Sequence, residues 1–386
     1  MRLILCASFT RNLSSLYIHI PFCHKACHYC DFHFSTNLAL KAELVTSISA
    51  EIVLQRDFLS EKTLDTIYFG GGTPSILSKS ELELLFELIH SNFQINKNAE
   101  ITLEANPDDL TLENLIMFKE LGINRLSIGI QSFDDRELKW MNRNHSSFQS
   151  LKSLEDARRA GFDNINIDLI YSIPGSSLAS LLKNIETAFS FRPEHISAYC
   201  LTIEEKTAFG KWLKQGKIKE LDEDQSFFQY ETLVSQLTAN GIFQYEISNF
   251  SRKGFESKHN SKYWENKEYL GVGPSAHSYR LNKRYSNISN NIRYIKSVRN
   301  KSVPNQEENL TLDQQRNEYI MTQLRKNSGL DTRLLNDLFD LDILHLKSGQ
   351  LEICHSLGMI EISDAIITLT TKGRFLSNSI ISMLLA

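Results

Sequence analysis

Residues 17–32 read YIHIPFCHKACHYCDF and place Cys23, Cys27 and Cys30 in a C-x3-C-x2-C spacing. An apolar run typical of a β-strand comes directly before them, so the three cysteines lie on one short loop. Thiolates are the soft ligands that bind iron–sulfur clusters and zinc. Three cysteines on one loop can bind three irons of a [4Fe-4S] cluster and leave the fourth iron open to another ligand.

A zinc site is the alternative for this loop, because His24, His28 or His33 could supply a fourth ligand. Structural zinc sites usually pair C-x2-C with a second ligand pair further along the chain. The sequence contains no such second pair. The spacing therefore favours the cluster over zinc.

The chain around this loop alternates short apolar runs with longer amphipathic ones. Strands are predicted at 15–20, 64–69, 100–104, 124–130, 164–171 and 195–201. Helical patterns lie between them, and alternating strands and helices predict parallel strands joined by right-handed crossovers. The fold class is therefore α/β, with a partial (β/α)6 barrel or an open sheet.

Later segments predict a second, smaller unit. A helix at 223–240 and a strand at 243–247 are followed by a loop-like stretch, 248–284, and an Asn-rich boundary, 287–309. Two helices come next, and the alternation at 365–376 predicts a hairpin wing. The expected division is an N-terminal extension (1–14), a barrel (15–250), a loop region and connector (251–310) and an α-rich, winged-helix-like domain (311–386).

Composition and charge narrow the functional classes. The chain has 386 residues, 41% of them hydrophobic and 23% charged, and a formal net charge of -4. Nucleic-acid binders normally carry a basic excess, so no nucleic-acid partner is expected. No apolar run reaches the roughly 18 residues of a membrane span. Clustered cysteines then favour a metal site in a cytoplasmic protein over disulfides.

Polar residues follow several predicted strands, at the edge where functional groups of parallel β/α folds gather. The second strand runs into Gly70–Gly71–Gly72–Thr73, the third ends in Glu104, the fourth runs into Gln131, the fifth contains Asp168 and the sixth ends near Thr202. Taken alone, each of these polar side chains is best explained as a structural residue that is hydrogen-bonded within the fold. Together they predict a ring of polar groups around one end of the barrel, which favours a polar ligand.

The cysteine segment resembles the signature of the radical S-adenosylmethionine (SAM) family, in the branch of oxygen-independent coproporphyrinogen III oxidases (HemN) and heme chaperones (HemW). The resemblance covers essentially the whole chain. It implies a [4Fe-4S] cluster on the three cysteines and SAM as a cofactor. The positions at which that family contacts SAM correspond here to Tyr17, Gly71, Gly72, Thr73, Glu104, Gln131, Arg143, Asp168 and Thr202.

Two features separate the oxidases of this branch from the chaperones. The oxidases carry a further cysteine two residues after the third cluster cysteine, where this chain has Phe32, and they have a longer segment before the cluster loop. The segment from His259 to Trp264 matches the HNxxYW motif of the chaperones. A neutral imidazole is a common axial ligand of heme iron, and flat aromatic rings suit a porphyrin. From these residues alone a structural loop is preferred; the resemblance reverses that preference and makes His259 the predicted heme ligand, with His277 as a second candidate.

The leading hypothesis is a heme chaperone that carries a cluster, SAM and heme. It would deliver heme to heme-accepting proteins, including respiratory enzymes at the membrane. The alternative is a radical SAM decarboxylase acting on a porphyrinogen propionate. Because the additional cysteine is missing, a role outside enzyme catalysis is preferred. Whether the chain forms a homodimer stays open.

Overall fold

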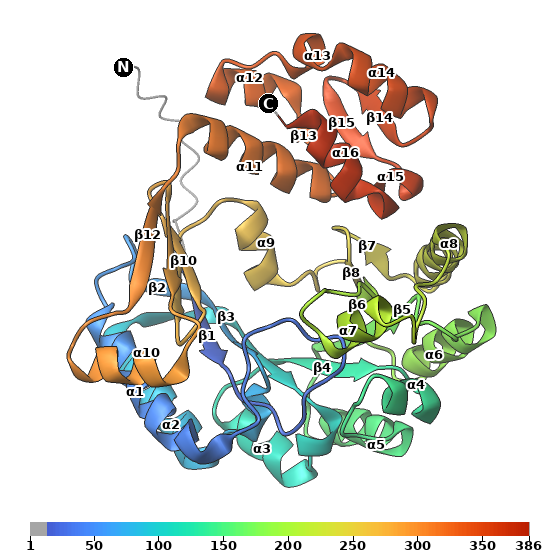
Figure 1. Ribbon diagram of the computed structural model, residues 1–386. Coiled ribbons are helices and arrows are strands. Elements are labelled where there is room, and N and C mark those ends of the chain that lie inside the picture. The colour runs from blue at the N-terminus through green and yellow to red at the C-terminus, as the bar shows by residue number, and fades with distance from the viewer. Residues whose placement is uncertain (1–13, 386) are drawn as a thin grey trace.

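The computed structural model describes residues 14–385. The predicted N-terminal extension lies outside these residues except for Ser14, which begins the first strand. A long curved sheet, helices on its outer side and a separate group of C-terminal helices make up the architecture (Figure 1).

All six predicted strands are present and lie side by side in chain order as parallel strands. They are β1 (Ser14–Ile20), β2 (Thr63–Gly71), β3 (Gln94–Ala105), β4 (Arg125–Gln131), β5 (Ile165–Tyr171) and β6 (His195–Cys200). The predicted partial α/β barrel is therefore confirmed. Strand β3 begins at Gln94 instead of residue 100, because its first, polar half pairs with β2 at the rim of the sheet.

The crossovers between these strands are helical. They contain α1 (Lys41–Leu54), α2 (Lys79–Asn92), α3 (Leu112–Glu120), α4 (Asp135–Trp140), α5 (Ser147–Arg159) and α6 (Leu178–Ser190). Helix α2 begins with a capping box in which Ser78 and Glu81 satisfy each other's backbone N–H groups. Within residues 14–385, no helix combines the length and apolar character needed to cross a membrane.

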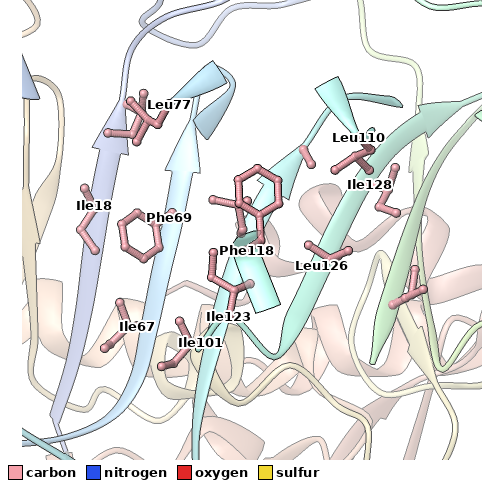
Figure 2. Packing of buried hydrophobic residues seen from close by; sticks show 14 of the residues in the cluster. Ile18, Ile67, Phe69, Leu77, Ile101, Leu110, Phe118, Ile123, Leu126 and Ile128 are labelled. Carbon is pink, nitrogen blue, oxygen red and sulfur yellow. The ribbon is translucent and has the colours of Figure 1, made fainter. Parts of the chain in front are cut away.

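The main core lies between the outer face of the sheet and these helices (Figure 2). Alternate strand residues such as Ile67, Phe69, Leu126 and Ile128 point into it and form one cluster with Phe118 of α3. Residues between them face the inner side of the barrel, since successive side chains of a strand point to opposite faces. On β4 these inner residues are Arg125, Ser127, Gly129 and Gln131, so the barrel interior is polar.

The sheet continues beyond the six strands on both sides. β7 (Phe243–Gln244) and β8 (Asn249–Ser251) extend it next to β6; β9 (Tyr269–Val272), β10 (His277–Arg280), β11 (Lys283–Asn287) and β12 (Asn305–Asn309) extend it next to β1. The prediction of a loop over 248–284 is therefore wrong. These strands are short, and most are too polar or glycine-rich to show an apolar alternation, so pairing with neighbouring strands creates them.

The Asn-rich stretch is also structured, since it contains α10 (Asn291–Arg299) and β12. Glu51 of α1 joins this region to the barrel. Its buried carboxylate accepts hydrogen bonds from Gly273 N–H (2.7 Å), the Asn287 side chain (2.8 Å) and the Tyr294 hydroxyl. Residues 287–309 are therefore attached to the barrel as part of its outer layer.

The C-terminal part has a hydrophobic core of its own. It contains α11 (Leu312–Arg325), β13 (Leu330–Asp331), α12 (Thr332–Phe339), α13 (Ile343–Leu346), α14 (Ser348–Ser356), β14 (Ile360–Ser363), β15 (Ile366–Leu369), α15 (Thr371–Phe375) and α16 (Ser377–Leu384). The predicted wing is present as the β14–β15 hairpin. It ends at Leu369 instead of residue 376, because Thr370 caps the start of α15 with its side chain.

Candidate functional site

The three cysteines of the loop after β1 line one cavity of about 590 Å³ at the carboxyl ends of the parallel strands. Backbone hydrogen bonds shape this loop. Cys23 N–H donates to the Ser35 carbonyl at 3.1 Å, and His28 N–H donates to the Met141 carbonyl at 3.1 Å. The loop is therefore attached both to its own returning end and to the segment after α4.

Two side chains from other loops, one after β2 and one between α4 and α5, donate hydrogen bonds to the cysteine sulfurs. The Thr73 hydroxyl lies 3.3 Å from Sγ of Cys23, and Nη1 of Arg143 lies 3.3 Å from Sγ of Cys27. Hydrogen bonds to sulfur stabilise the thiolate and adjust the potential of a cluster. Within residues 14–385 no group of three His, Cys, Asp or Glu side chains is placed to hold a single metal ion.

The three histidines that could complete a zinc site are engaged elsewhere. Nε2 of His24 lies 3.2 Å from Asp109, Nδ1 of His28 lies 2.9 Å from the Trp140 carbonyl, and Nε2 of His33 lies 2.9 Å from the Asn291 side chain. The thiol set of this loop thus fits a [4Fe-4S] cluster better than zinc.

Burial keeps the thiols of Cys23 and Cys30 protonated when no metal is bound. It raises the pKa of Cys30 to about 11. It also raises the pKa of Cys23, although the hydrogen bond from Thr73 opposes the shift. Because iron binds the thiolate, cluster binding at this loop must release protons.

The glycines after β2 bring the backbone close to the cluster loop. Gly71 has a φ of 109°, and a Cβ on it would lie 2.7 Å from the His19 ring. A Cβ on Gly72 would lie 2.7 Å from the Phe22 carbonyl oxygen. Only glycine fits such approaches without displacing the neighbouring chain. The resulting edge leaves room for a ligand between β2 and the cysteines.

Arg143 connects the cluster loop to β3 and β4. Its Nη2 donates to the Asn106 side chain at 2.6 Å and to the Gly129 carbonyl at 2.7 Å, while its Nη1 reaches Cys27. Asn106 in turn donates to the Thr73 hydroxyl at 3.1 Å. This chain of contacts fixes a positive charge on the cavity wall, suited to a ligand carboxylate.

Two carboxyl groups, Glu104 and Asp168, face the same cavity from β3 and β5. Burial raises the pKa of Glu104 to about 7, against the hydrogen bonds from Tyr68 and Gly71. Burial raises the pKa of Asp168 to about 6, opposed by the Asn166 amide, which donates at 2.7 Å. Both groups would ionise more readily beside a cationic ligand, because an opposite charge favours the charged form.

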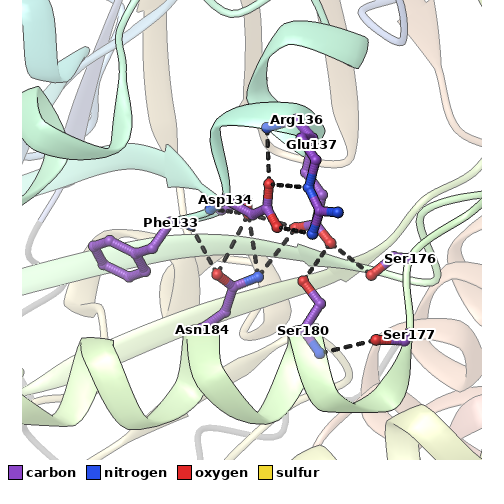
Figure 3. A network of polar contacts seen from close by, with 9 residues as sticks. Phe133, Asp134, Arg136, Glu137, Ser176, Ser177, Ser180 and Asn184 are labelled. Carbon is purple, nitrogen blue, oxygen red and sulfur yellow. Dashed lines mark hydrogen bonds and ion pairs between the residues drawn. The ribbon is translucent and has the colours of Figure 1, made fainter.

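Gln131 ends β4 in a left-handed conformation, with a φ of 66°. A buried network directly after it supports this turn (Figure 3). The carboxylate of Glu137 accepts hydrogen bonds from the side chains of Ser132, Asn184, Ser176 and Ser180. These donors come from the ends of β4 and β5 and from α6, so one carboxylate ties together the segments that carry Gln131.

His259 lies away from this cavity, in the short helix α9 (Lys258–Trp264) at the inner side of β2 and β3. Its side chain is buried, with Nδ1 2.7 Å from the Thr66 hydroxyl and Nε2 2.8 Å from the Tyr263 hydroxyl. The backbone N–H groups at 258 and 259 donate to Glu100 at 3.1 and 3.0 Å, which fixes the start of α9. In this conformation both ring nitrogens are engaged. Heme ligation by His259 would require α9 to open, and it stays a prediction.

Tyr17 also does not line the cavity. Its hydroxyl lies 3.0 Å from Nδ1 of His19, and its ring stacks on Tyr68 with centroids 6.1 Å apart. The other predicted residues do line it: Cys23, Cys27, Cys30, Gly71, Gly72, Thr73, Glu104, Gln131, Arg143, Asp168 and Thr202.

Sequence reasoning missed several lining residues, among them Asn106, Ser127 and Tyr199. Asn106 lies two residues after Glu104 and Ser127 lies four before Gln131, so the two-residue period of a strand would have indicated both. Tyr199 lies three residues before Thr202 and falls outside that period. Tyr29 was missed as well, and only its hydroxyl contact with Arg143 at 3.4 Å makes it visible.

Known proteins similar to this chain agree with the fold. The profile of the Radical SAM superfamily matches residues 17–188, and that of the HemN C-terminal domain matches residues 310–376. The structure of coproporphyrinogen III oxidase (HemN) from Escherichia coli, described as a radical SAM enzyme, superimposes with a TM-score of 0.83 at 25% identity, over 97% of this chain and 90% of that one.

Two curated relatives are similar over nearly their whole length. Heme chaperone HemW of Bacillus subtilis is 36% identical over 95% of this chain and 98% of its own. Heme chaperone HemW of Lactococcus lactis is 34% identical over 95% and 96%, respectively. The chain therefore belongs to the HemW family of the radical SAM superfamily.

Proposed function

We propose that the chain is a heme chaperone that binds heme and passes it to heme-dependent proteins in the cytoplasm or at the membrane, respiratory enzymes among them. The observation that carries this proposal is the near full-length similarity to several proteins named heme chaperone HemW. Membership in the radical SAM superfamily implies a [4Fe-4S] cluster and SAM as cofactors.

The residues of the cluster cavity have separate tasks in this proposal. Cys23, Cys27 and Cys30 would hold the cluster, and Arg143 would face the SAM carboxylate. Asp168 would accept hydrogen bonds from ribose hydroxyls. When bound, the cluster can supply an electron to SAM. The chain itself contributes the fixed position of these groups in one cavity.

A second candidate function, decarboxylation of a porphyrinogen, is favoured by the structural similarity to the Escherichia coli oxidase. Phe32 argues against it. The oxidases resembled by this chain have a cysteine at that position, whereas Phe32 presents an apolar ring that is 74% exposed at the edge of the cavity. An exposed ring there suits contact with a flat apolar ligand better than thiol chemistry.

The test is an anaerobic hemin titration of cluster-reconstituted protein, followed in the Soret band, and then incubation with an apo heme protein. The proposal expects saturable binding at one hemin per chain and transfer that exceeds spontaneous dissociation. Absence of saturable binding would overturn it. Formation of carbon dioxide from coproporphyrinogen III with SAM and a reductant would establish the second candidate instead.

A further inference from the structure

A second cavity, of about 640 Å³, lies between the barrel and the C-terminal helices. The ends of β5 and β6 and helix α8 (Glu223–Ala239) line one side, and α11, α15 and α16 contribute the other. In Figure 1 these C-terminal helices lie above β6 and α8. Its volume falls within the roughly 300–1,000 Å³ that is usual for ligand sites.

This cavity adjoins the cluster cavity. Residues 199–202, at the end of β6 and just after it, line both. A ligand in the second cavity would therefore lie beside SAM and the cluster, separated by one stretch of chain.

Two arginines line the second cavity from the C-terminal side, Arg325 of α11 and Arg374 of α15. Nη2 of Arg325 donates to the Asn378 side chain at 2.8 Å, and Nη1 of Arg374 donates to the Gln244 side chain at 3.0 Å. Within residues 14–385 neither forms an ion pair with a carboxylate. Nε of Arg325 is buried and has no hydrogen-bond partner among these residues. Partly buried cations without a paired anion mark a site for an anionic ligand.

The carboxylates near these arginines do not neutralise them. Glu220 and Glu223 line the cavity but are exposed to solvent. Glu246 is buried close to Arg325, where it accepts a hydrogen bond from Asn249. Burial raises the pKa of Glu246, which favours its uncharged form. Among residues 14–385 none of these three carboxyl groups forms an ion pair with Arg325 or Arg374, so both guanidinium groups can still bind an anion.

The other walls combine serine hydroxyls with aromatic and aliphatic side chains. Tyr199 is 43% exposed, and Leu201 lies next to it in the wall shared with the cluster cavity. Phe375 of α15 packs on Tyr230 of α8 with ring centroids 5.7 Å apart. Flat apolar surfaces together with two guanidinium groups suit a planar ring that carries carboxylates.

We propose that this second cavity is the heme site, with the propionates of heme bound by Arg325 and Arg374 and the ring lying against Tyr199 and Leu201. The inference rests on the proposed heme-binding function and adds its location. It differs from ligation at His259, whose nitrogens are engaged inside the barrel.

The test compares hemin with hemin dimethyl ester, in which both propionates are neutral, on the full-length, cluster-reconstituted protein. Arg325→Gln and Arg374→Gln are measured beside Arg333→Gln, a control in the same C-terminal part whose side chain is 65% exposed. We expect each cavity variant to lose about tenfold in hemin affinity, because a charge-assisted hydrogen bond is removed. The affinity of each cavity variant for the diester, and the affinity of the Arg333→Gln control for hemin, should stay unchanged.

Lysine variants at both positions exclude a folding defect. They keep the charge and should recover part of the preference for hemin over its diester. If both glutamine variants keep the wild-type affinity and preference, or lose hemin and diester equally, the cavity is not the propionate site. Wild-type protein that binds no hemin would instead overturn the proposed function itself, so the two failures are distinguishable.

Discussion

Replacing His259 with alanine distinguishes a heme ligand from a structural residue. The ring is 1% exposed and stacks on Tyr68 with centroids 4.9 Å apart. Thr66 donates to the Ser15 hydroxyl at 2.9 Å, so Nδ1 of His259 is the donor toward Thr66 and Nε2 accepts from Tyr263. Burial lowers the pKa of His259 to about 3, so the ring is neutral at physiological pH.

The expected cost follows from these contacts. Truncation leaves the buried Tyr263 hydroxyl without its acceptor, at about 1–3 kcal/mol. The loss of the packed ring adds a cavity term, and a total of about 3 kcal/mol is expected. If this loss falls on the local stability of α9, the helix should open about a hundredfold more often.

Hydrogen-exchange mass spectrometry of peptides covering 256–268 measures that opening, and a hemin titration of the same samples measures binding. An alanine variant of His90, an exposed histidine of α2, is the matched control. We expect faster exchange in α9 for His259→Ala and unchanged hemin affinity. Loss of hemin binding with unchanged exchange would refute this reasoning and make His259 a ligand.

Three further predictions concern the cluster cavity and its surroundings. Arg143→Lys keeps the charge but cannot contact Cys27, Asn106 and Gly129 together, so SAM should bind about tenfold more weakly by calorimetry; unchanged affinity would contradict the assignment. Asp168 has a folded pKa of about 6, above its unfolded value, so its ionisation costs stability as pH rises through 6. Asp168→Asn should therefore raise the melting temperature of SAM-free protein at pH 8 while weakening SAM binding, and a lower melting temperature would argue against a buried charge. Burial lowers the pKa of His145 to about 4, so between pH 6.5 and 4 the unfolded chain binds more protons than the folded one, and the free energy of unfolding falls with pH by up to about 3 kcal/mol. His145→Asn should reduce this loss of stability in acid, as measured by urea titrations at several pH values. An unchanged pH dependence would exclude His145 as its cause.

The sequence predicted the six parallel strands and the cysteine loop because both are local patterns. An apolar run buried in a parallel sheet is visible without knowing its neighbours, and so is a C-x3-C-x2-C spacing. Strands β9–β12 were not predictable in this way, because polar residues such as Lys283 and Arg284 become strand residues only by pairing with their neighbours. The orientation of His259 depends on Glu100 and Thr66, which lie more than 150 residues earlier.

The second cavity also depends on contacts between distant parts of the chain, which the sequence alone does not show. Arg325 and Arg374 are far apart in sequence and belong to no motif. Only the packing of the helices brings them to one cavity and leaves both without a carboxylate partner, so the sequence alone could not indicate them. The cluster residues, in contrast, follow strands whose order along the chain is also their order in space.

The short wall at the end of β6 separates two compartments, and thermodynamic reciprocity applies across it. If SAM in one compartment changes the affinity for a ligand in the other by some factor, that ligand changes the affinity for SAM by the same factor. With a coupling of this kind, dissociation of SAM would weaken the binding of the ligand in the second cavity and so promote its release. Residues 199–202 would then transmit this coupling, since they line both cavities.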